Sequence, residues 1–340
     1  MKAAFLRKPY TFEIIDRPLP KPKENEVLIR VRRCGICGSD LHAYKGLHPD
    51  YILPIVMGHE FSGEIVEIGK NVEKFEVGDK VTVEPLITCG KCRFCIKGEY
   101  NRCTSLKVIG CQADGAFTEY ISIPERWVYK LPENVSYEEG AMVEPLAVAV
   151  HAVKRVADLG DNILVLGAGT IGLLTAQVAK AFGATNVFIT DIVDWKIDFA
   201  KRLGIDYPLN PLKNDLNKIL MERTENIGVD TTFEAVGSNT TLNQALDLTR
   251  KGGNIVIIGV YEKPMVNINV MNIVNKELNV YGTLVYRWDF EKAINLIKKN
   301  MVDVRSLVSK VIGLNDIEQG FKSMISREKN IIKIQVDPSK

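Results

Sequence analysis

The sequence predicts an α/β protein in which a domain with a doubly wound parallel sheet is joined to a second, mostly β domain. Two observations support this prediction. From about residue 160, apolar strand-like segments alternate with amphipathic helical segments, which is the pattern of a parallel sheet covered by helices. Before residue 137 no long helical period occurs, and short strand-like segments dominate. A chain of 340 residues has room for two such domains.

The expected elements follow one another in a regular order. In the first part we expect strands at 27–31, 65–69 and 76–83, the third entered through a Gly-Asp turn. The alternating part is expected to contain strand 163–166, a helix ending near 182, strand 187–190, helix 195–203, strand 229–235, helix 241–250 and strand 254–258. A helix at 289–299 and a strand at 331–336 close the chain. Because this last strand has no partner in the α/β part, we expect it to return to the first domain.

Composition is that of an ordinary globular protein. Hydrophobic residues make up 46% of the chain and charged residues 25%, and 44 Lys and Arg against 42 Asp and Glu give a net charge of +2. A nucleic-acid-binding protein would carry a clear basic stripe, so no nucleic-acid partner is expected. Disulfide scaffolds are short and secreted. Since five of the seven cysteines have metal-ligand spacings, we expect a reducing, cytoplasmic location.

One uncharged stretch, residues 162–179, has 18 residues and approaches the length of a membrane span. It contains three glycines together with Thr170, Thr175 and Gln177, and it divides naturally into a strand, a turn and a helix. The N-terminus runs directly into strand-like sequence and has no apolar signal-peptide region. We therefore expect a soluble protein with no membrane partner.

A glycine-rich loop follows the first strand of the alternating part. Gly167, Gly169 and Gly172 have the spacing G-x-G-x-x-G, with Thr170 and Ile171 between the last two, and the loop opens a helix. The first glycine permits the tight turn, the second lets a pyrophosphate approach the backbone, and the third lets helix and strand pack closely. The free N–H groups of the helix N-terminus would then face the phosphates. This context predicts a dinucleotide-binding loop formed by these five residues.

An acidic residue follows the loop at the expected distance. Asp191 comes 19 residues after Gly172, at the end of the second strand. A carboxylate there accepts hydrogen bonds from the adenosine ribose and repels a 2′-phosphate, which predicts NAD rather than NADP. The alternative is that Asp191 only caps the following helix. Lys196 either contacts the ribose or phosphate or is a solvated surface lysine.

Four cysteines with the spacing C-x2-C-x2-C-x7-C predict a closed metal site. They are Cys89, Cys92, Cys95 and Cys103. A redox dithiol needs only one CxxC pair, and an iron–sulfur cluster would carry single electrons, for which nothing else in the chain has a use. Four thiolates leave no open position on zinc, so we expect a structural ion that folds the loop.

Cys37, His59 and Glu60 are candidates for a second metal site, one with an open position. A catalytic zinc has three protein ligands and binds water or substrate at the fourth position. Cys37 also forms a CxxC pair with Cys34, but the βαβ context of a redox motif is missing.

Two polar residues follow the first ligand of this second site. Ser39 and His42 lie two and five residues after Cys37. This placement suits a hydroxyl–imidazole relay that carries a proton to solvent. The alternative is that His42 is an exposed surface histidine.

With these residues in view, the chain resembles the zinc-dependent medium-chain dehydrogenases over nearly its whole length. The segments that carry the resemblance are Gly-His-Glu-Phe-Ser-Gly-Glu at 58–64, Gly-Asp-Lys-Val at 78–81, Gly-Ile-Cys-Gly-Ser-Asp at 35–40 and the four-cysteine segment. The resemblance implies a mostly β, GroES-like catalytic domain formed by residues 1–148 and 288–340. It also implies an NAD-binding Rossmann domain at 149–287, with the substrate in the cleft where the domains meet.

Within that family the chain is similar to the polyol branch. Typical alcohol dehydrogenases have a cysteine ligand where this chain has Glu144, in the sequence Val-Glu-Pro-Leu. The resemblance implies a catalytic zinc held by Cys37, His59 and Glu60, with Glu144 binding directly or through water. It further implies two zinc ions per chain, NAD as coenzyme and a homotetramer.

The implied reaction is oxidation of a secondary alcohol of a sorbitol- or iditol-like polyol to a ketone. Zinc would act as a Lewis acid on the substrate hydroxyl, and the hydride would pass to the nicotinamide. A 2,3-butanediol or L-threonine dehydrogenase is the alternative, and residues 318–321 resemble the butanediol type. A non-catalytic zinc-binding protein would be expected to have lost ligands, and every ligand is present.

Overall fold

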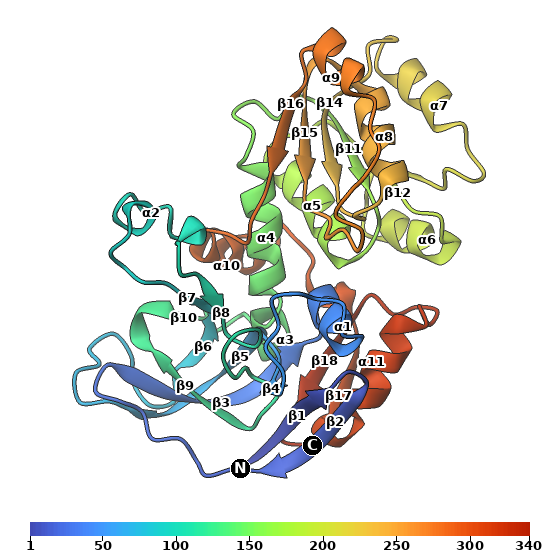
Figure 1. The fold of residues 1–340 in the computed structure, drawn as a ribbon. Helices are drawn as coiled ribbons and strands as arrows, with labels where there is room; N and C mark the ends of the chain where they lie inside the picture. The colour runs from blue at the N-terminus through green and yellow to red at the C-terminus, as the bar shows by residue number, and fades with distance from the viewer. The chain divides into compact units, whose positions relative to one another are not determined.

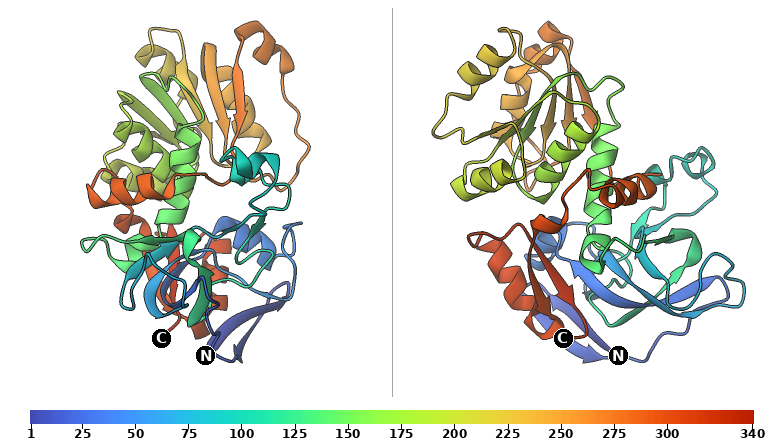
Figure 2. Two further views of the ribbon diagram at one scale, coloured as in Figure 1. Left: turned by 90° about the vertical axis from the view of Figure 1, so that its left-hand side faces the viewer. Right: turned by 180° about the vertical axis from the view of Figure 1, so that it is seen from behind.

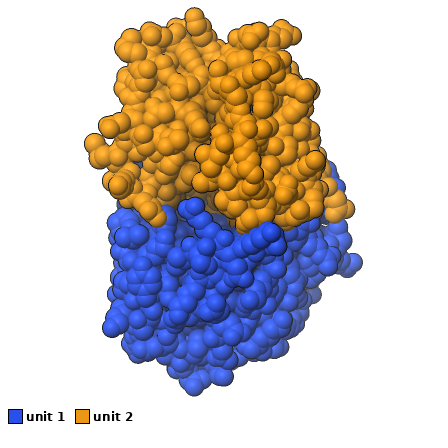
Figure 3. Space-filling model, turned by 90° about the vertical axis from the view of Figure 1, so that its right-hand side faces the viewer, with its two compact units in different colours: residues 1–144, 290–299, 304–340 blue, residues 145–289, 300–303 orange.

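The computed structural model describes residues 1–340 and divides into two compact units. Unit 1 comprises residues 1–144, 290–299 and 304–340, and unit 2 comprises residues 145–289 and 300–303. Figure 3 colours unit 1 blue and unit 2 orange. None of the helices combines the length and the apolar character that a membrane crossing requires.

Unit 1 is built around a seven-stranded sheet with the order β10-β6-β5-β3-β18-β17, in which β9 also pairs with β3. The strands are β3 (Glu26–Gly35), β5 (Glu60–Ile68), β6 (Lys80–Val83), β9 (Tyr120–Pro124), β10 (Val128–Lys130), β17 (Val308–Gly313) and β18 (Lys333–Asp337). The C-terminal strand β18 pairs antiparallel with β3. The tail of the chain therefore lies in the same sheet as its N-terminal part (Figure 1).

Smaller elements complete unit 1. They are the strands β1 (Lys2–Lys8), β2 (Thr11–Asp16), β4 (Ile55–Val56), β7 (Leu86–Ile87) and β8 (Lys107–Val108), and the helices α1 (Gly38–Tyr44), α2 (Arg93–Ile96), α3 (Tyr137–Gly140), α10 (Phe290–Lys298) and α11 (Ile317–Ile325). An aromatic cluster packs α1 against α11. The rings of Phe12, Tyr44 and Phe321 lie 5.0–5.5 Å apart, centroid to centroid. This packing fixes the position of α1, which carries several candidate site residues.

Unit 2 contains a six-stranded sheet with the order β13-β12-β11-β14-β15-β16, and each neighbouring pair is parallel. Its strands are β11 (Asn162–Leu166), β12 (Asn186–Thr190), β13 (Tyr207–Leu209), β14 (Val229–Glu234), β15 (Thr249–Ile257) and β16 (Asn279–Gly282). The accompanying helices are α4 (Val143–Val153), α5 (Thr170–Ala181), α6 (Asp194–Arg202), α7 (Leu216–Arg223), α8 (Asn239–Leu248) and α9 (Val270–Lys276). Helices flank the sheet in both views of Figure 2, which is why strands such as β11 are buried, apolar runs.

The predicted fold class is confirmed: a doubly wound parallel sheet is combined with a mostly β unit. The strand order reverses beside β11, where β12 lies on one side and β14 on the other. Ligands of such sheets bind at the carboxyl ends of the strands at this reversal. One helix differs from its predicted range, 241–250. Ser238 caps α8 by accepting a hydrogen bond from Thr241 N, so the helix begins at Asn239, and residues 249–250 begin β15 instead.

Candidate functional site

Cys37, His59 and Glu60 come together in unit 1. Their ligand atoms, a thiol sulfur, an imidazole nitrogen and a carboxylate oxygen, lie within 4.8 Å of one another. The register of β3 with β5 produces this grouping, because it places Gly35 opposite Glu60 and thereby brings together the end of β3 and the start of β5. His59 and Glu60 are buried. Cys37 is partly buried. A thiol, an imidazole and a carboxylate gathered in this way fit a zinc ion.

Asp40 supports the group from α1 and is fully buried. Its carboxylate accepts hydrogen bonds from Cys37 N and from the Tyr51 hydroxyl, each over 2.9 Å. Asp40 Oδ1 also lies 3.6 Å from His59 Nδ1. This distance is longer than a hydrogen bond, so Asp40 acts on His59 through its charge. Burial lowers the pKa of His59, but the charges of Asp40 and Cys37 outweigh it, and the pKa is raised.

A buried lysine pairs with the carboxylate of the group. Lys333 Nζ donates to Glu60 Oε1 and Oε2 over 2.9 and 2.8 Å, and to the carbonyl oxygen of Ile36 over 3.0 Å. Strand β18 delivers this lysine because it pairs with β3. Burial lowers the pKa of Lys333, but the negative charge of Glu60 and of its neighbours outweighs this effect, and the pKa is raised. Sequence reasoning missed Lys333, although a lysine within the apolar run Ile-Ile-Lys-Ile was a usable signal.

The remaining residues predicted for this site lie close by, also in unit 1. Glu144 is buried and is not one of the three grouped residues, but its charge contributes to the raised pKa of His59. Ser39 Oγ lies 3.3 Å from the Tyr51 hydroxyl. His42 is partly buried and lies three residues after Ser39 on α1. Tyr51 is a second residue that sequence reasoning missed, and it links Ser39 to Asp40.

The four cysteines Cys89, Cys92, Cys95 and Cys103 form a second group in unit 1, with their sulfur atoms within 4.8 Å of one another. Backbone N–H groups point at the sulfurs: Cys92 N donates to Cys89 Sγ, and Cys89 N to Cys103 Sγ, each over 3.3 Å. Backbone hydrogen bonds, that from Cys95 first, lower the pKa of Cys92. Four converging sulfurs held as hydrogen-bonded acceptors fit a closed zinc site.

The glycine loop of unit 2 joins β11 to α5, with Gly169 as the N-cap and Thr170 and Ile171 in the first turn. Gly167 has a φ of +103°, which favours glycine. A Cβ on Gly172 would collide with the carbonyl oxygen of Gly167, whereas a Cβ on Gly169 would meet nothing within 4 Å. The loop therefore packs tightly on its inner side and is open at its helix N-terminus, as a bound pyrophosphate requires.

Asp191 directly follows β12, at the same edge of the sheet as the glycine loop. Its Oδ1 atom accepts a hydrogen bond from Val193 N over 3.0 Å, which shapes the turn into α6. Lys196 Nζ lies 3.3 Å from Asp191 Oδ2. The two candidate ribose-binding residues are thus an ion pair in this structure.

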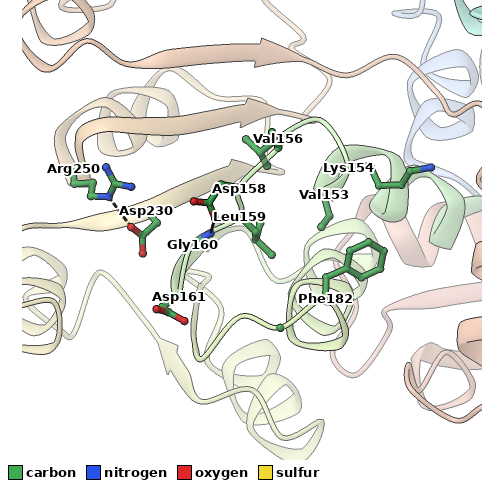
Figure 4. A pocket seen from close by; sticks show the side chains of 12 residues that line it. Val153, Lys154, Val156, Asp158, Leu159, Gly160, Asp161, Phe182, Asp230 and Arg250 are labelled. Carbon is green, nitrogen blue, oxygen red and sulfur yellow. Dashed lines mark hydrogen bonds and ion pairs between the residues drawn. The ribbon is translucent and has the colours of Figure 1, made fainter.

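A hollow of about 760 Å³ in unit 2 lies at the opposite edge of the sheet (Figure 4). Asp158, Gly160, Asp230 and Arg250 are among its lining residues, next to the amino ends of β11 and β14. These groups already satisfy one another: Arg250 Nε donates to Asp230 Oδ1 over 2.6 Å, and Gly160 N to Asp158 Oδ1 over 3.1 Å. Because the glycine loop is at the carboxyl edge, this hollow is separate from the candidate coenzyme site.

Known proteins resemble both parts of the chain. Residues 23–133 match the family described as alcohol dehydrogenase GroES-like domain, and residues 170–299 match the family described as zinc-binding dehydrogenase. The chain is 34% identical to sorbitol dehydrogenase of Bacillus subtilis, covering 100% of this chain and 98% of that protein. It is 39% identical to (R,R)-butanediol dehydrogenase of the same organism, covering 100% of both. A solved alcohol dehydrogenase from Escherichia coli, complexed with NADH, is 31% identical over 99% of both chains, with a TM-score of 0.92.

Proposed function

The chain belongs to the zinc-binding alcohol dehydrogenase family and is a zinc- and NAD-dependent dehydrogenase, and on this premise we propose that it oxidises a secondary alcohol of a sorbitol- or iditol-like polyol to a ketone. The observation that carries the proposal is the grouping of Cys37, His59 and Glu60, whose ligand atoms lie within 4.8 Å of one another. The feature by which the sequence resembles the polyol branch is Glu144, which stands where typical alcohol dehydrogenases have a cysteine ligand. The relative named sorbitol dehydrogenase supports the same substrate class.

When bound, zinc would polarise the substrate hydroxyl and NAD would accept the hydride. Cys37, His59 and Glu60 would hold the zinc and leave one position for the substrate oxygen. Glu144 is outside this group, so we propose Glu60 as the direct ligand and Glu144 as a carboxylate that acts through water. Asp40 would place a buried negative charge 3.6 Å from His59 Nδ1. The four-cysteine group would hold the second, structural zinc.

The substrate proton would leave through Ser39 and His42 in this proposal. The Ser39 hydroxyl also contacts Tyr51, but Tyr51 donates to the buried Asp40, so that branch leads away from solvent. His42 is the more accessible exit. Replacing His42 with alanine should lower turnover at neutral pH and leave coenzyme affinity unchanged. An exogenous imidazole buffer should restore part of the rate, and a variant with full turnover would contradict the relay.

We propose unit 1 as the catalytic domain and unit 2 as the coenzyme domain. The glycine loop from Gly167 to Gly172 would bind the pyrophosphate, and Asp191 with Lys196 would face the adenosine ribose. A cytoplasmic homotetramer is part of the same proposal. The edge strand β16 supports self-association, because it has a paired neighbour on one side only and carries the exposed Val280.

The substrate proposal is tested by initial rates of NAD reduction with zinc-replete protein on sorbitol, xylitol, galactitol, 2,3-butanediol and L-threonine. We expect the highest kcat/KM for a long polyol. A preference for 2,3-butanediol, which the relative of that name makes the second candidate, would keep the zinc chemistry and replace the substrate. No turnover with any of these compounds would overturn the polyol proposal.

A further inference from the structure

Glu234 is a buried carboxylate that the proposed reaction does not yet use. It is the last residue of β14 and is fully buried. In the sheet it lies opposite Leu166, the residue that precedes the glycine loop, and on its other side opposite Ile257 of β15. Glu234 is therefore at the carboxyl edge of the sheet, beside the strand reversal where ligands of this fold bind.

The side chain of Glu234 accepts hydrogen bonds from neutral donors. Val236 N, Gly237 N and Thr241 Oγ1 donate to Oε1 over 3.0, 2.9 and 2.7 Å, and the Tyr261 hydroxyl donates to Oε2 over 3.1 Å. An ionised carboxylate is an acceptor only, so this shell of donors suits the charged form. No cation is among these partners. Burial raises the pKa of Tyr261, and the charge of Glu234 raises it further.

Glu234 also organises the two loops that follow β14 and β15. Its side chain holds the first loop at Val236 and Gly237, and its backbone carbonyl accepts from Ile258 N and Gly259 N of the second loop over 2.8 and 2.9 Å. The first loop in turn lies against the glycine loop: a Cβ on Gly167 would be 2.7 Å from the side chain of Val236.

The strand order indicates which half of a dinucleotide these loops would receive. Asp191 follows β12 on one side of β11, and Glu234 ends β14 on the other side. With the adenosine ribose at Asp191 and the pyrophosphate at the glycine loop, the nicotinamide half extends toward the ends of β14 and β15. The buried charge of Glu234 is thus on the nicotinamide side of the site.

We propose that Glu234 is a positioning residue whose unpaired charge favours binding of the oxidised coenzyme over the reduced one. The inference rests on the proposed coenzyme site. The nicotinamide ring of NAD⁺ carries a positive charge, which it loses when it takes a hydride from the alcohol carbon, while the hydroxyl proton leaves to solvent. A fixed negative charge in a low-dielectric surrounding therefore stabilises bound NAD⁺ more than bound NADH. The same difference assists release of the reduced product.

The test is the ratio of the dissociation constants, Kd(NAD⁺)/Kd(NADH), measured by titration calorimetry on the zinc-loaded full chain. Glu234→Gln keeps the size of the side chain and removes its charge. We expect the ratio to rise by about fivefold to tenfold, the scale of one unit charge at an effective dielectric of about 20. If the substitution only loosened the loops, binding of both coenzymes would weaken by the same factor and the ratio would not change. An unchanged ratio would overturn the proposal.

Asp230→Asn is the matched control. It removes a carboxylate from the other end of β14, where Asp230 pairs with Arg250 over 2.6 Å, and the ratio should stay at the wild-type value. An equal change in both variants would overturn the assignment to Glu234. If Glu234→Gln does not fold, Tyr261→Phe is the second variant. It removes a neutral donor from Glu234 Oε2 and keeps the carboxylate charge, which is then less screened, so Kd(NAD⁺)/Kd(NADH) should fall. An unchanged or raised ratio would contradict the proposal. Failure of the wild type to bind either coenzyme would instead overturn the proposed function.

Discussion

Asp191 Oδ2 accepts a hydrogen bond from the backbone nitrogen of Ala168 over 3.1 Å. Ala168 lies between Gly167 and Gly169, so the end of β12 is tied directly to the glycine loop. Asp191 consequently has two roles in the proposed coenzyme site. It orders the loop that would receive the pyrophosphate, and it presents a carboxylate where the adenosine ribose would lie.

Replacing Asp191 with alanine should weaken NAD binding and increase the tolerance of NADP. The loss of a charged acceptor predicts a decrease of about tenfold to a hundredfold in kcat/KM for NAD. The measurement is kcat/KM for NAD and for NADP at one substrate concentration. Asp191→Asn serves as control, because its amide oxygen retains an acceptor for Ala168 N while the charge that would repel a 2′-phosphate is gone. An unchanged coenzyme preference in both variants would remove Asp191 from the site.

Replacing Lys333 with methionine should strip the buried Glu60 of its partner. Breaking a buried pair costs about 3–5 kcal/mol of the free energy of unfolding, and we expect this loss in the zinc-free protein. With zinc bound the loss should be smaller, since the ion supplies a compensating charge. The measurement is urea denaturation with and without a chelator.

The control for that variant is Lys322→Met, which breaks an exposed pair with Glu318 of 2.7 Å. Exposed pairs of this kind contribute about 0.5 kcal/mol or less. If both variants lost the same free energy of unfolding, the Lys333–Glu60 pair would not contribute the predicted stability.

Replacing Cys95 with serine should remove one zinc ion from the protein and should disorder the four-cysteine segment. Helix α2 has no buried residue, and within residues 89–103 only Tyr100, Asn101 and Cys103 are buried. This segment therefore has little apolar core, and we expect it to depend on its metal. We expect rapid cleavage between residues 89 and 103 in limited proteolysis and a zinc content reduced by one equivalent. Cys111→Ser, which changes a buried thiol outside the group, should keep both zinc ions. A protease-resistant Cys95→Ser protein would contradict the structural role.

Replacing Asp289 with asparagine should reduce stability in a pH-dependent manner. Asp289 is fully buried and accepts from His151 Nδ1, Lys154 Nζ and Arg287 N over 2.8, 2.6 and 3.0 Å. Burial raises the pKa of Asp289, but the hydrogen bonds from His151 and Lys154 outweigh it, and the pKa is lowered. A lowered carboxyl pKa contributes stability above the unfolded value of about 3.9 and loses it as pH falls through the folded value.

The difference in unfolding free energy between wild type and Asp289→Asn should therefore be about 1–3 kcal/mol at neutral pH and should close as the pH falls below about 4. Urea denaturation from pH 7 to pH 3 measures it. Asp198→Asn, at an exposed position of α6, should show no such difference. A difference in unfolding free energy between wild type and Asp289→Asn that stays constant from pH 7 to pH 3 would contradict this explanation.

Local sequence patterns predicted much of the fold and the main features of the candidate site. The loop from Gly167 to Gly172 was recognisable because its turn, its preceding strand and its helix are adjacent in the chain. The grouping of Cys37 with His59 and Glu60 was expected from their ligand chemistry, and the β3–β5 register supplies the physical reason.

Non-local packing limited the rest. Lys333 is 273 residues from Glu60, and the two meet only because β18 pairs with β3. The contact of Tyr51 with Ser39 and Asp40 depends on the path of the loop after α1, which no periodicity predicts. The role of Glu234 could not be predicted either, because its donors follow two different strands, β14 and β15, that only parallel pairing brings together.

The most direct test of the central claim measures zinc content and NADH formation together in the wild type and in Cys37→Ser, with Cys34→Ala as the matched control. The account predicts two zinc ions and turnover in the wild type, one zinc ion and loss of turnover in Cys37→Ser, and two zinc ions with turnover in Cys34→Ala. A Cys37→Ser protein that retains both zinc ions and reduces NAD at the wild-type rate would contradict the assignment of Cys37, His59 and Glu60 to the catalytic metal.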